Sequence, residues 1–186
     1  MSAGFVFTAA SAQVQFGVKA GANFSTLTGS DVSGAKTLVG FHGGGLVSVP
    51  IFSTFTLQPE VLYSMQGAKG TESETDITLH QNYVNVPVLF KYNHASGFFA
   101  ATGPQIGFLV SAKAKEGGET TDVKSYYKST DFSWAVAIGY KLPSINAGID
   151  VRYNFGLTNI ADYSGADVKN SVFQVGLFYL FGQTKK

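Results

Sequence analysis

The feature that most constrains this chain is a strict alternation of side-chain types between Ile145 and Phe181. Two runs in this stretch place apolar residues on one parity, namely Ala147, Ile149, Val151, Tyr153, Phe155 and Leu157, then Phe173, Val175, Leu177, Tyr179 and Phe181. A period of two is typical of β-strands, whose successive side chains point to opposite faces. We therefore interpret the stretch as a β-hairpin with one apolar face.

The other parity of these runs has an unusual composition for a soluble protein. In the first run it reads Asn146, Gly148, Asp150, Arg152, Asn154 and Gly156, and in the second it reads Gln174, Gly176, Phe178 and Leu180. A soluble β-protein covers its outer face with charges, yet only 13% of this chain is charged, against about 25% in typical globular domains. Small and amide residues suit the polar interior of a barrel whose apolar face contacts lipid.

Segments with a period of two, bounded by turn residues, occur eight times along the chain. They span residues 14–27, 37–49, 54–67, 79–93, 97–114, 130–142, 145–159 and 170–182. Each exceeds the roughly nine to eleven residues that a tilted strand needs to cross a bilayer, and no apolar run approaches the roughly 18 to 20 of a spanning helix. We expect an all-β fold, an eight-stranded antiparallel up-and-down transmembrane β-barrel.

The connections between these segments alternate in length. The long, polar ones cover residues 28–36, 68–78, 115–129 and 160–169, and the others are short. Short turns at one end and long loops at the other are typical of outer-membrane barrels. The pattern predicts a bacterial outer-membrane location, with both ends of the barrel chain on the short-turn, periplasmic side.

Two finer expectations concern strand pairing. If residues 142–145 form a turn, Tyr140 lies opposite Ala147 and Trp134 lies opposite Tyr153, all facing outward. Trp134 and Tyr153 would then belong to the aromatic girdle at the far interface. Three prolines, Pro59, Pro87 and Pro104, lie inside expected strands, where each removes one ladder donor. We expect β-bulges at these positions.

The first twelve residues differ in character from the rest. They are apolar and end in Ala10-Ser11-Ala12, which has the small-residue form of a signal-peptidase site. No basic residue precedes Lys19, so we interpret residues 1–12 as the remnant of a truncated signal peptide and residues 13–186 as the barrel domain. The alternative is that residues 1–12 belong to an ordinary first strand.

Charged residues on the inward parity are the candidate site. The inward polar set is Lys19, Asn23, Gln58, Glu60, Asn85, Lys91, Gln105, Asp150, Arg152, Asn154 and Gln174. Buried charges must pair, so we expect Lys19, Lys91 or Arg152 to neutralise Glu60 and Asp150. The favoured interpretation is a structural polar network that plugs the lumen; the alternative is a gated ion path or a ligand site.

No pattern in the sequence points to catalysis or to a cofactor. The chain has no cysteine, and His42, His80 and His94 have no metal-binding spacing. No Gly-x-Ser-x-Gly motif accompanies the Ser, His and Asp residues. A net charge of +1 gives no basic field for nucleic acid. We expect no enzymatic activity, no metal, no cofactor and no nucleic-acid partner.

Several segments together resemble a known family. They are Gly40–Val49, LQPEVLYS from Leu57, YVNVPVLFKY from Tyr83, GPQIGF from Gly103, DVRYNFGLTNI from Asp150 and QVGLFYLF from Gln174. The chain is similar to the PorT-like outer-membrane β-barrel family of Bacteroidota and, more distantly, to the eight-stranded barrels of the OmpA/OmpX type. The resemblance implies a barrel inserted by the assembly machinery, and only some members of that family are tied to secretion or gliding. The chain departs from such barrels in its tail, because Phe181 is followed by five further residues.

These observations predict a structural or surface-interaction role for a monomeric barrel with a plugged lumen. Expected partners are outer-membrane lipid, the barrel assembly machinery and a surface or secretion-apparatus protein. One alternative is a narrow pore for ions or small solutes. A second is a soluble lipocalin-like carrier, which would have the same barrel with its faces inverted.

Overall fold

The computed structural model describes residues 14–182 except 31, 33, 73, 74, 143 and 164. Its strands are β1 (Gln15–Thr28), β2 (Lys36–Pro50), β3 (Phe55–Glu72), β4 (Thr75–Asn93), β5 (Phe98–Glu116), β6 (Glu119–Asp122), β7 (Thr130–Leu142), β8 (Ala147–Gly156) and β9 (Lys169–Phe181). A 3-10 helix, η1 (Lys124–Tyr126), follows β6. In the described part of the chain, no helix has the length and apolar character needed to cross a membrane.

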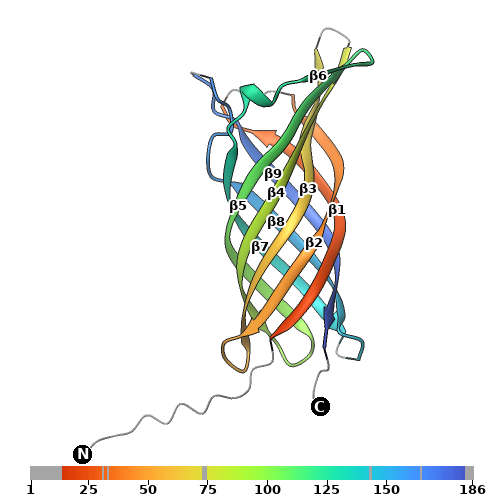
Figure 1. The fold of residues 1–186 in the computed structure, drawn as a ribbon, viewed down its shortest axis with the longest axis vertical. Helices are drawn as coiled ribbons and strands as arrows, with labels where there is room; N and C mark the ends of the chain where they lie inside the picture. Colours follow the sequence, from red (N-terminus) through yellow and green to blue (C-terminus); the bar gives the residue numbers. More distant parts are fainter. Residues whose placement is uncertain are drawn as a thin grey trace, which may run out of the picture.

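All strand pairs are antiparallel, and the sheet closes on itself (Figure 1). Each long strand pairs with its neighbours along the chain, and β9 returns to pair with β1 from Phe16↔Phe181 to Thr28↔Lys169. The short strand β6 adds only to β5, above the barrel. The predicted eight-stranded up-and-down barrel is therefore confirmed. Residues 1–12, which we interpret as the remnant of a signal peptide, lie outside the described residues.

The predicted strand bounds agree with the structure except at the loop end. There, the expected loop 68–78 is mostly strand, because β3 and β4 keep pairing from Ala68↔Leu79 to Glu72↔Thr75. Part of the expected loop 115–129 is also paired, as β6 folds back on the end of β5. Figure 1 shows these strands rising above the rest of the barrel wall. Neither of these loop-end segments, residues 68–72 and 75–79, contains a proline, so the hydrogen bonding continues beyond the other strands.

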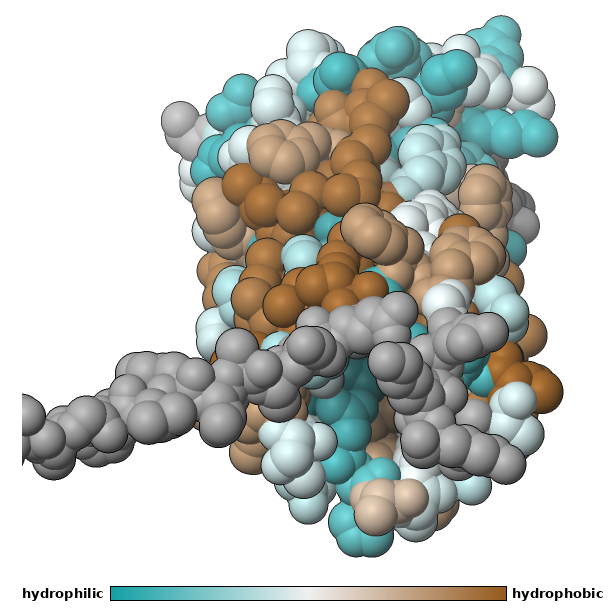
Figure 2. All heavy atoms as spheres, turned by 60° about the horizontal axis from the view of Figure 1, so that its bottom comes forward, coloured by the Kyte–Doolittle hydropathy of each residue, from teal (hydrophilic) through white to brown (hydrophobic). Residues whose placement is uncertain are grey.

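The two faces of the wall have the predicted polarity. Apolar side chains on the outward parity are exposed, including Phe16 at 62% and Leu177 at 65%, whereas the inward polar side chains are buried. Figure 2 shows the apolar side chains along the barrel wall and hydrophilic residues at the loop end. An apolar outer surface with a polar interior is the arrangement of a barrel embedded in lipid.

The predicted register of the hairpin between β7 and β8 is wrong by two residues. Leu142 pairs with Ala147, so Tyr140 lies opposite Ile149 and Trp134 lies opposite Phe155. The connection between the two strands ends at Asn146, which has a φ of 54°, a left-handed conformation that asparagine tolerates better than most residues. Because the error is an even number of residues, every side chain stays on its predicted face.

The bulges expected at the three prolines are also wrong. Pro59 lies opposite Val88, Pro87 opposite Gln105 and Pro104 opposite Trp134, and the register does not shift across any of them. The register shifts occur instead between Thr37 and His42 in the β2–β3 ladder and at Asn82–Tyr83 in the β4–β5 ladder. A proline removes one N–H donor but keeps an extended backbone, so the repeat of the ladder survives.

Outward aromatic side chains form two groups along the wall. Beside the short turns, Phe55 stacks on Phe90 with ring centroids 5.0 Å apart, and the rings of Phe98 and Tyr140 have centroids 4.9 Å apart. Toward the loop end the contacting pairs are Phe24–Phe173, Phe41–Tyr63 and Tyr153–Phe155. Aromatic residues gather at both interfaces of outer-membrane barrels. The two groups place the membrane between the short turns and the loops.

Candidate functional site

The middle of the lumen holds two positive and two negative side chains in contact. Arg152 on β8 donates two hydrogen bonds to Glu60 on β3, Nη1 to Oε2 and Nη2 to Oε1, each 2.8 Å long. Lys19 on β1 forms an ion pair with Asp150. Arg152 Nη2 also lies 3.8 Å from Asp150 Oδ2. We call these four residues the ion layer; its formal charges sum to zero, and all four side chains are buried.

The alternation of β-strands explains how the ion layer forms. Asp150 and Arg152 lie two residues apart on β8, so both side chains enter the lumen. Glu60 shares the inward parity of β3 with Gln58, which donates from Nε2 to Glu60 Oε1 at 2.7 Å. The bidentate Arg152–Glu60 contact crosses the lumen, because β3 and β8 are not neighbours in the sheet. Bidentate arginine–carboxylate pairs combine charge with fixed geometry.

Lys91 lies apart from the ion layer, toward the short turns. Its Nζ donates to Gln58 Oε1 at 3.3 Å and stands 3.7 Å above the ring of Phe99 and 5.0 Å from that of Phe178. Within the described residues it forms no ion pair. Of the five predicted lumen residues, the structure therefore brings together Lys19, Glu60, Asp150 and Arg152, while Lys91 is held by an amide and by aromatic faces.

An apolar layer closes the lumen beside Lys91. It consists of Leu46, Phe99, Phe178 and Leu180, all buried, and the rings of Phe99 and Phe178 contact each other at 5.8 Å between centroids. Gly139 and Gly148 face these rings, and a Cβ at either glycine would overlap a ring atom. Glycine on the inward parity therefore makes the space in which two phenylalanines fit.

An amide network lies on the other side of the ion layer. Asn23 Oδ1 accepts hydrogen bonds from Gln174 Nε2 at 2.8 Å and from His42 Nδ1 at 2.7 Å. Asn23 Nδ2 donates to Ser64 Oγ at 2.9 Å and to the carbonyl of Met65 at 2.8 Å. With Nδ1 protonated, His42 Nε2 is an acceptor. It finds no partner among the described protein atoms.

His42 and Asp150 direct acceptor atoms toward the same small space. Asp150 Oδ1, like His42 Nε2, has no hydrogen-bond partner among the described protein atoms. A Cβ placed on Gly176 would lie 2.8 Å from Asp150 Oδ1 and 3.1 Å from His42 Nε2. Gly176 thus keeps the amide network and the ion layer within reach of each other.

Sequence reasoning missed His42, Asp131 and the two inward phenylalanines. His42 shares the inward parity of β2, and this signal was sufficient to place it in the lumen. Asp131, at the start of β7, accepts a hydrogen bond from Asn170 Nδ2 at 2.9 Å. Phe99 and Phe178 also lie on the inward parity, but an aromatic residue in a polar interior was not anticipated.

The loops at the far end pack over the barrel. Ile160, Ala161 and Val168 form a small buried cluster, against which Leu27, Val32, Tyr127 and Ala166 pack. Asn159 organises this segment, because its Oδ1 accepts from the amides of Ala161 and Val168, each at 3.0 Å. Tyr127 pairs with Ala161 as an isolated β-bridge. We call this set of contacts the loop cap.

The loop cap also joins segments from different hairpins. Lys128 N donates to the carbonyl of Ile160 at 2.8 Å, and Asp162 N donates to that of Tyr126 at 2.9 Å. Burial, together with nearby Tyr163, raises the pKa of Tyr127 above its ordinary value. The Tyr127 side chain also packs against the buried cluster of Tyr83, Leu109 and Ala112.

The described residues include no candidate metal centre. No group of three or more His, Cys, Asp or Glu side chains in this part of the chain is placed to hold a metal ion. The histidines lie apart: His42 is in the lumen, His80 is in the loop-end half of β4, and His94 is in the turn after β4, with Ser96 Oγ 2.7 Å from its Nδ1.

Comparisons with solved structures give the same architecture. Neisserial surface protein A matches with a TM-score of 0.59 and 17% identity, over 89% of this chain and 97% of that chain. Ail, the attachment invasion locus protein of Yersinia pestis, solved with the heparin analogue sucrose octasulfate, matches with a TM-score of 0.52 and 17% identity, over 91% and 99%. At these identities the likeness concerns the fold alone.

The family follows from the sequence itself. No curated protein matches the chain significantly. Residues 9–162, however, match the family described as outer membrane protein beta-barrel domain. This match covers most of the strands of the closed barrel, whose outer face is apolar and whose lumen is polar. The chain belongs to the outer membrane protein beta-barrel domain family, and it is a protein of the bacterial outer membrane.

Proposed function

We propose that this barrel is a non-conducting, non-enzymatic membrane anchor whose loop end contacts partners at the cell surface. The observation that carries the proposal is the bidentate Arg152–Glu60 pair, which joins two non-neighbouring strands across the lumen. An open pore would need hydrated charges along its wall, whereas these two side chains are buried and bonded to each other.

Three successive layers support a plugged lumen. The ion layer is flanked on the short-turn side by the apolar layer of Leu46, Phe99, Phe178 and Leu180, and on the loop side by the amide network around Asn23. The interior of an eight-stranded barrel is just wide enough for side chains to fill. Ions would have to displace both aromatic rings and ion pairs to pass.

Conductance of the purified barrel in planar bilayers tests the plug. We expect the wild-type protein to be silent, and we expect current from a variant that combines Phe99→Ala, Phe178→Ala and Arg152→Ala. The matched control carries three alanine substitutions on the outward face, Val136→Ala, Val151→Ala and Leu177→Ala, and should also be silent. Stable wild-type channels would overturn the plug and support a narrow pore for ions or small solutes.

Packing at the loop end supports the surface-interaction role. The loop cap fixes segments that follow β1, η1 and β8 relative to one another, while Tyr126 and Tyr163 stay 60% and 55% exposed. Exposed tyrosines on a fixed backbone are typical of protein-binding surfaces. A photo-crosslinking residue at Tyr126 or Tyr163 should yield discrete adducts on intact cells. The same residue at Phe52, in a short turn, should yield none of these adducts.

The proposal extends to the PorT-like branch of the family and to the partners of the barrel. The sequence segments shared with the PorT-like branch favour that branch, and with it a surface or secretion-apparatus protein as the partner. We also propose that the barrel is a monomer, inserted by the barrel assembly machinery and surrounded by outer-membrane lipid, and that it binds no nucleic acid. Deleting the protein in its native host should impair protein secretion or surface motility if the PorT-like assignment is right, and unchanged secretion and motility would count against it.

The lipocalin-like alternative is not retained. A soluble carrier would turn its apolar side chains into the barrel, whereas here they cover the outer wall. The family match to outer-membrane barrels points the same way. Extraction should therefore require detergent, and the folded protein should migrate differently on a gel before and after boiling.

A further inference from the structure

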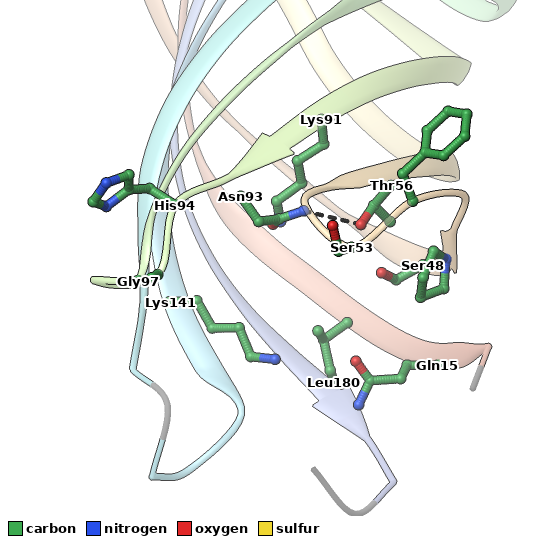
Figure 3. Close-up of a pocket in the computed structure, with 13 residues that line it drawn as sticks. Gln15, Ser48, Ser53, Thr56, Lys91, Asn93, His94, Gly97, Lys141 and Leu180 are labelled. Carbon is green, nitrogen blue, oxygen red and sulfur yellow. Dashed lines mark hydrogen bonds between the residues drawn. The ribbon is translucent and has the colours of Figure 1, made fainter. Parts of the chain in front are cut away.

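The mouth of the barrel at the short-turn end contains a pocket of about 290 Å³ (Figure 3). Its walls come from β1, β2, β3, β4, β7 and β9 and from the turns after β2 and β4. It lies on the periplasmic side of the apolar layer. Leu180 belongs to both, and Lys91, which lines the pocket, contacts the Phe99 ring of the layer. The pocket is therefore separate from the ion layer and from the loop cap.

The charged side chains that line this pocket are all basic or potentially basic. They are Lys91, Lys141 and His94, and none of the described residues that line the pocket carries a carboxylate. The lumen carboxylates that come nearest along the barrel, Glu60 and Asp150, are already bonded to Arg152 and Lys19. Neither Lys91 nor Lys141 forms an ion pair with a carboxylate in the described part of the chain.

The side chains of Lys91 and Lys141 line the same pocket. Lys91 is almost completely buried, at 3% exposure, and within the described part of the chain its ammonium donates one hydrogen bond, to the neutral Gln58 amide at 3.3 Å. Lys141 sends its Nζ across the mouth toward Gln15 and Leu180 (Figure 3). A buried ammonium without an anionic partner is costly, so an anion between the lysines would stabilise both.

Neutral hydrogen-bonding groups complete the pocket. Gln15, Ser48, Ser53, Thr56 and Asn93 contribute amide and hydroxyl groups to its lining. Asn93 Nδ2 donates to Thr56 Oγ1 at 2.9 Å, which orients this hydroxyl so that it can donate its own proton. Lysine ammonium groups with hydroxyl and amide donors are suited to phosphate oxygens. The volume suits a small ligand, since pockets for drug-sized molecules begin at about 300 Å³.

We propose that the periplasmic mouth is a binding site for a small phosphate-bearing anion, held between Lys91 and Lys141. The phosphate could be a soluble anion of the periplasm or the headgroup of an inner-leaflet lipid, because the outward aromatic side chains beside the short turns lie at the interface where headgroups gather. The site does not depend on the proposed surface role, since it lies at the opposite end of the barrel.

The first arm of the test is a titration of the full chain, in a neutral maltoside detergent, with inorganic phosphate at constant ionic strength maintained with chloride. The amide resonances of Asn93 and Gly97 report on the pocket. We expect a saturable shift that Lys141→Gln weakens about tenfold, the effect of losing one hydrogen bond to a charged group. Lys113→Gln, which removes an exposed lysine at the loop end of β5, is the matched control and should leave the affinity unchanged.

The second arm identifies the source of the phosphate. The same resonances are recorded without added phosphate in nanodiscs of phosphatidylcholine and in nanodiscs that contain phosphatidylglycerol. Shifts equal to the phosphate-saturated values only with phosphatidylglycerol would assign the site to a lipid headgroup, and saturable shifts only on adding phosphate would assign it to a soluble anion. No saturable shift in either arm, or an equal shift with chloride alone or in Lys141→Gln, would overturn the proposal.

Discussion

Two neighbouring layers of the lumen stabilise buried cations in different ways. In the ion layer, Arg152 and Lys19 each contact a carboxylate. One step toward the periplasm, the partners of Lys91 among the described residues are the Gln58 oxygen and the faces of two aromatic rings. Both environments are buried, so the difference lies in the partner and not in the exposure.

The difference separates a structural role from a binding role. In the ion layer each carboxylate contacts a cation and the formal charges sum to zero, so the layer has no net charge with which to attract an ion. An ammonium over aromatic rings keeps its full charge and can still attract an anion. The comparison therefore predicts a large loss of stability when a partner is removed from the ion layer and small losses when Lys91 is replaced.

The largest effect should come from Glu60→Leu. The substitution leaves the guanidinium of Arg152 buried with only the longer contact to Asp150. Breaking one side of a buried ion pair costs about 3–5 kcal/mol. Unfolding by guanidinium chloride in lipid vesicles measures the loss. The double variant Glu60→Leu with Arg152→Met should recover most of it, and a double variant as unstable as the single one would contradict the pairing.

Placing a guanidinium on the other side of the wall should give the next largest effect. Val136 lies in the middle of β7 with its side chain turned outward. An arginine on the lipid face near the bilayer midplane costs about 2–4 kcal/mol, so Val136→Arg should destabilise the barrel by that amount. The adjacent lumen substitution Ala137→Ser should cost little in the same assay. Equal losses would mean that the faces are reversed.

The apolar layer should respond to added volume. A Cβ at Gly139 would overlap the ring of Phe99, and overpacking a filled interior costs about 1–3 kcal/mol. Gly139→Ala should therefore lower the free energy of unfolding by this amount. Gly70→Ala is the control, because no atom lies within 4 Å of its Cβ position. If both variants had wild-type stability, the apolar layer would be looser than the contacts indicate.

The fold was predictable because one rule, alternation, fixes strand type and face together. The positions of Phe16 and Leu177 outside, and of Lys19 and Glu60 inside, follow from parity alone. The register of β7 on β8 did not follow, because it depends on a turn that can close in more than one way around Asn146. The extension of β3 and β4 was missed for a similar reason, since polar strand residues beyond the membrane look like loop residues.

For the candidate site, the sequence predicted which residues enter the lumen but not which of them pair. Parity placed Lys19, Glu60, Asp150 and Arg152 in the lumen, but the choice of partner depends on the tilt and curvature of the whole barrel. Glu60 and Arg152 meet across strands that share no ladder. The aromatic support of Lys91 was missed because Phe99 and Phe178 were not considered as partners for a cation.

The smallest effect separates the two kinds of buried lysine directly. Lys91→Met keeps the unbranched packing over Phe99 and Phe178, removes a cation–π contact and also removes the cost of burying a charge. Loss of the cation–π contact destabilises the barrel and loss of the buried charge stabilises it, so the change in the free energy of unfolding should stay within about 1 kcal/mol. The same substitution at Lys19 leaves Asp150 without its closest cation and should cost about 3 kcal/mol. If the two variants were equally unstable in one unfolding assay, Lys91 would be a member of the ion layer after all, and the periplasmic mouth would have no lysine to offer an anion.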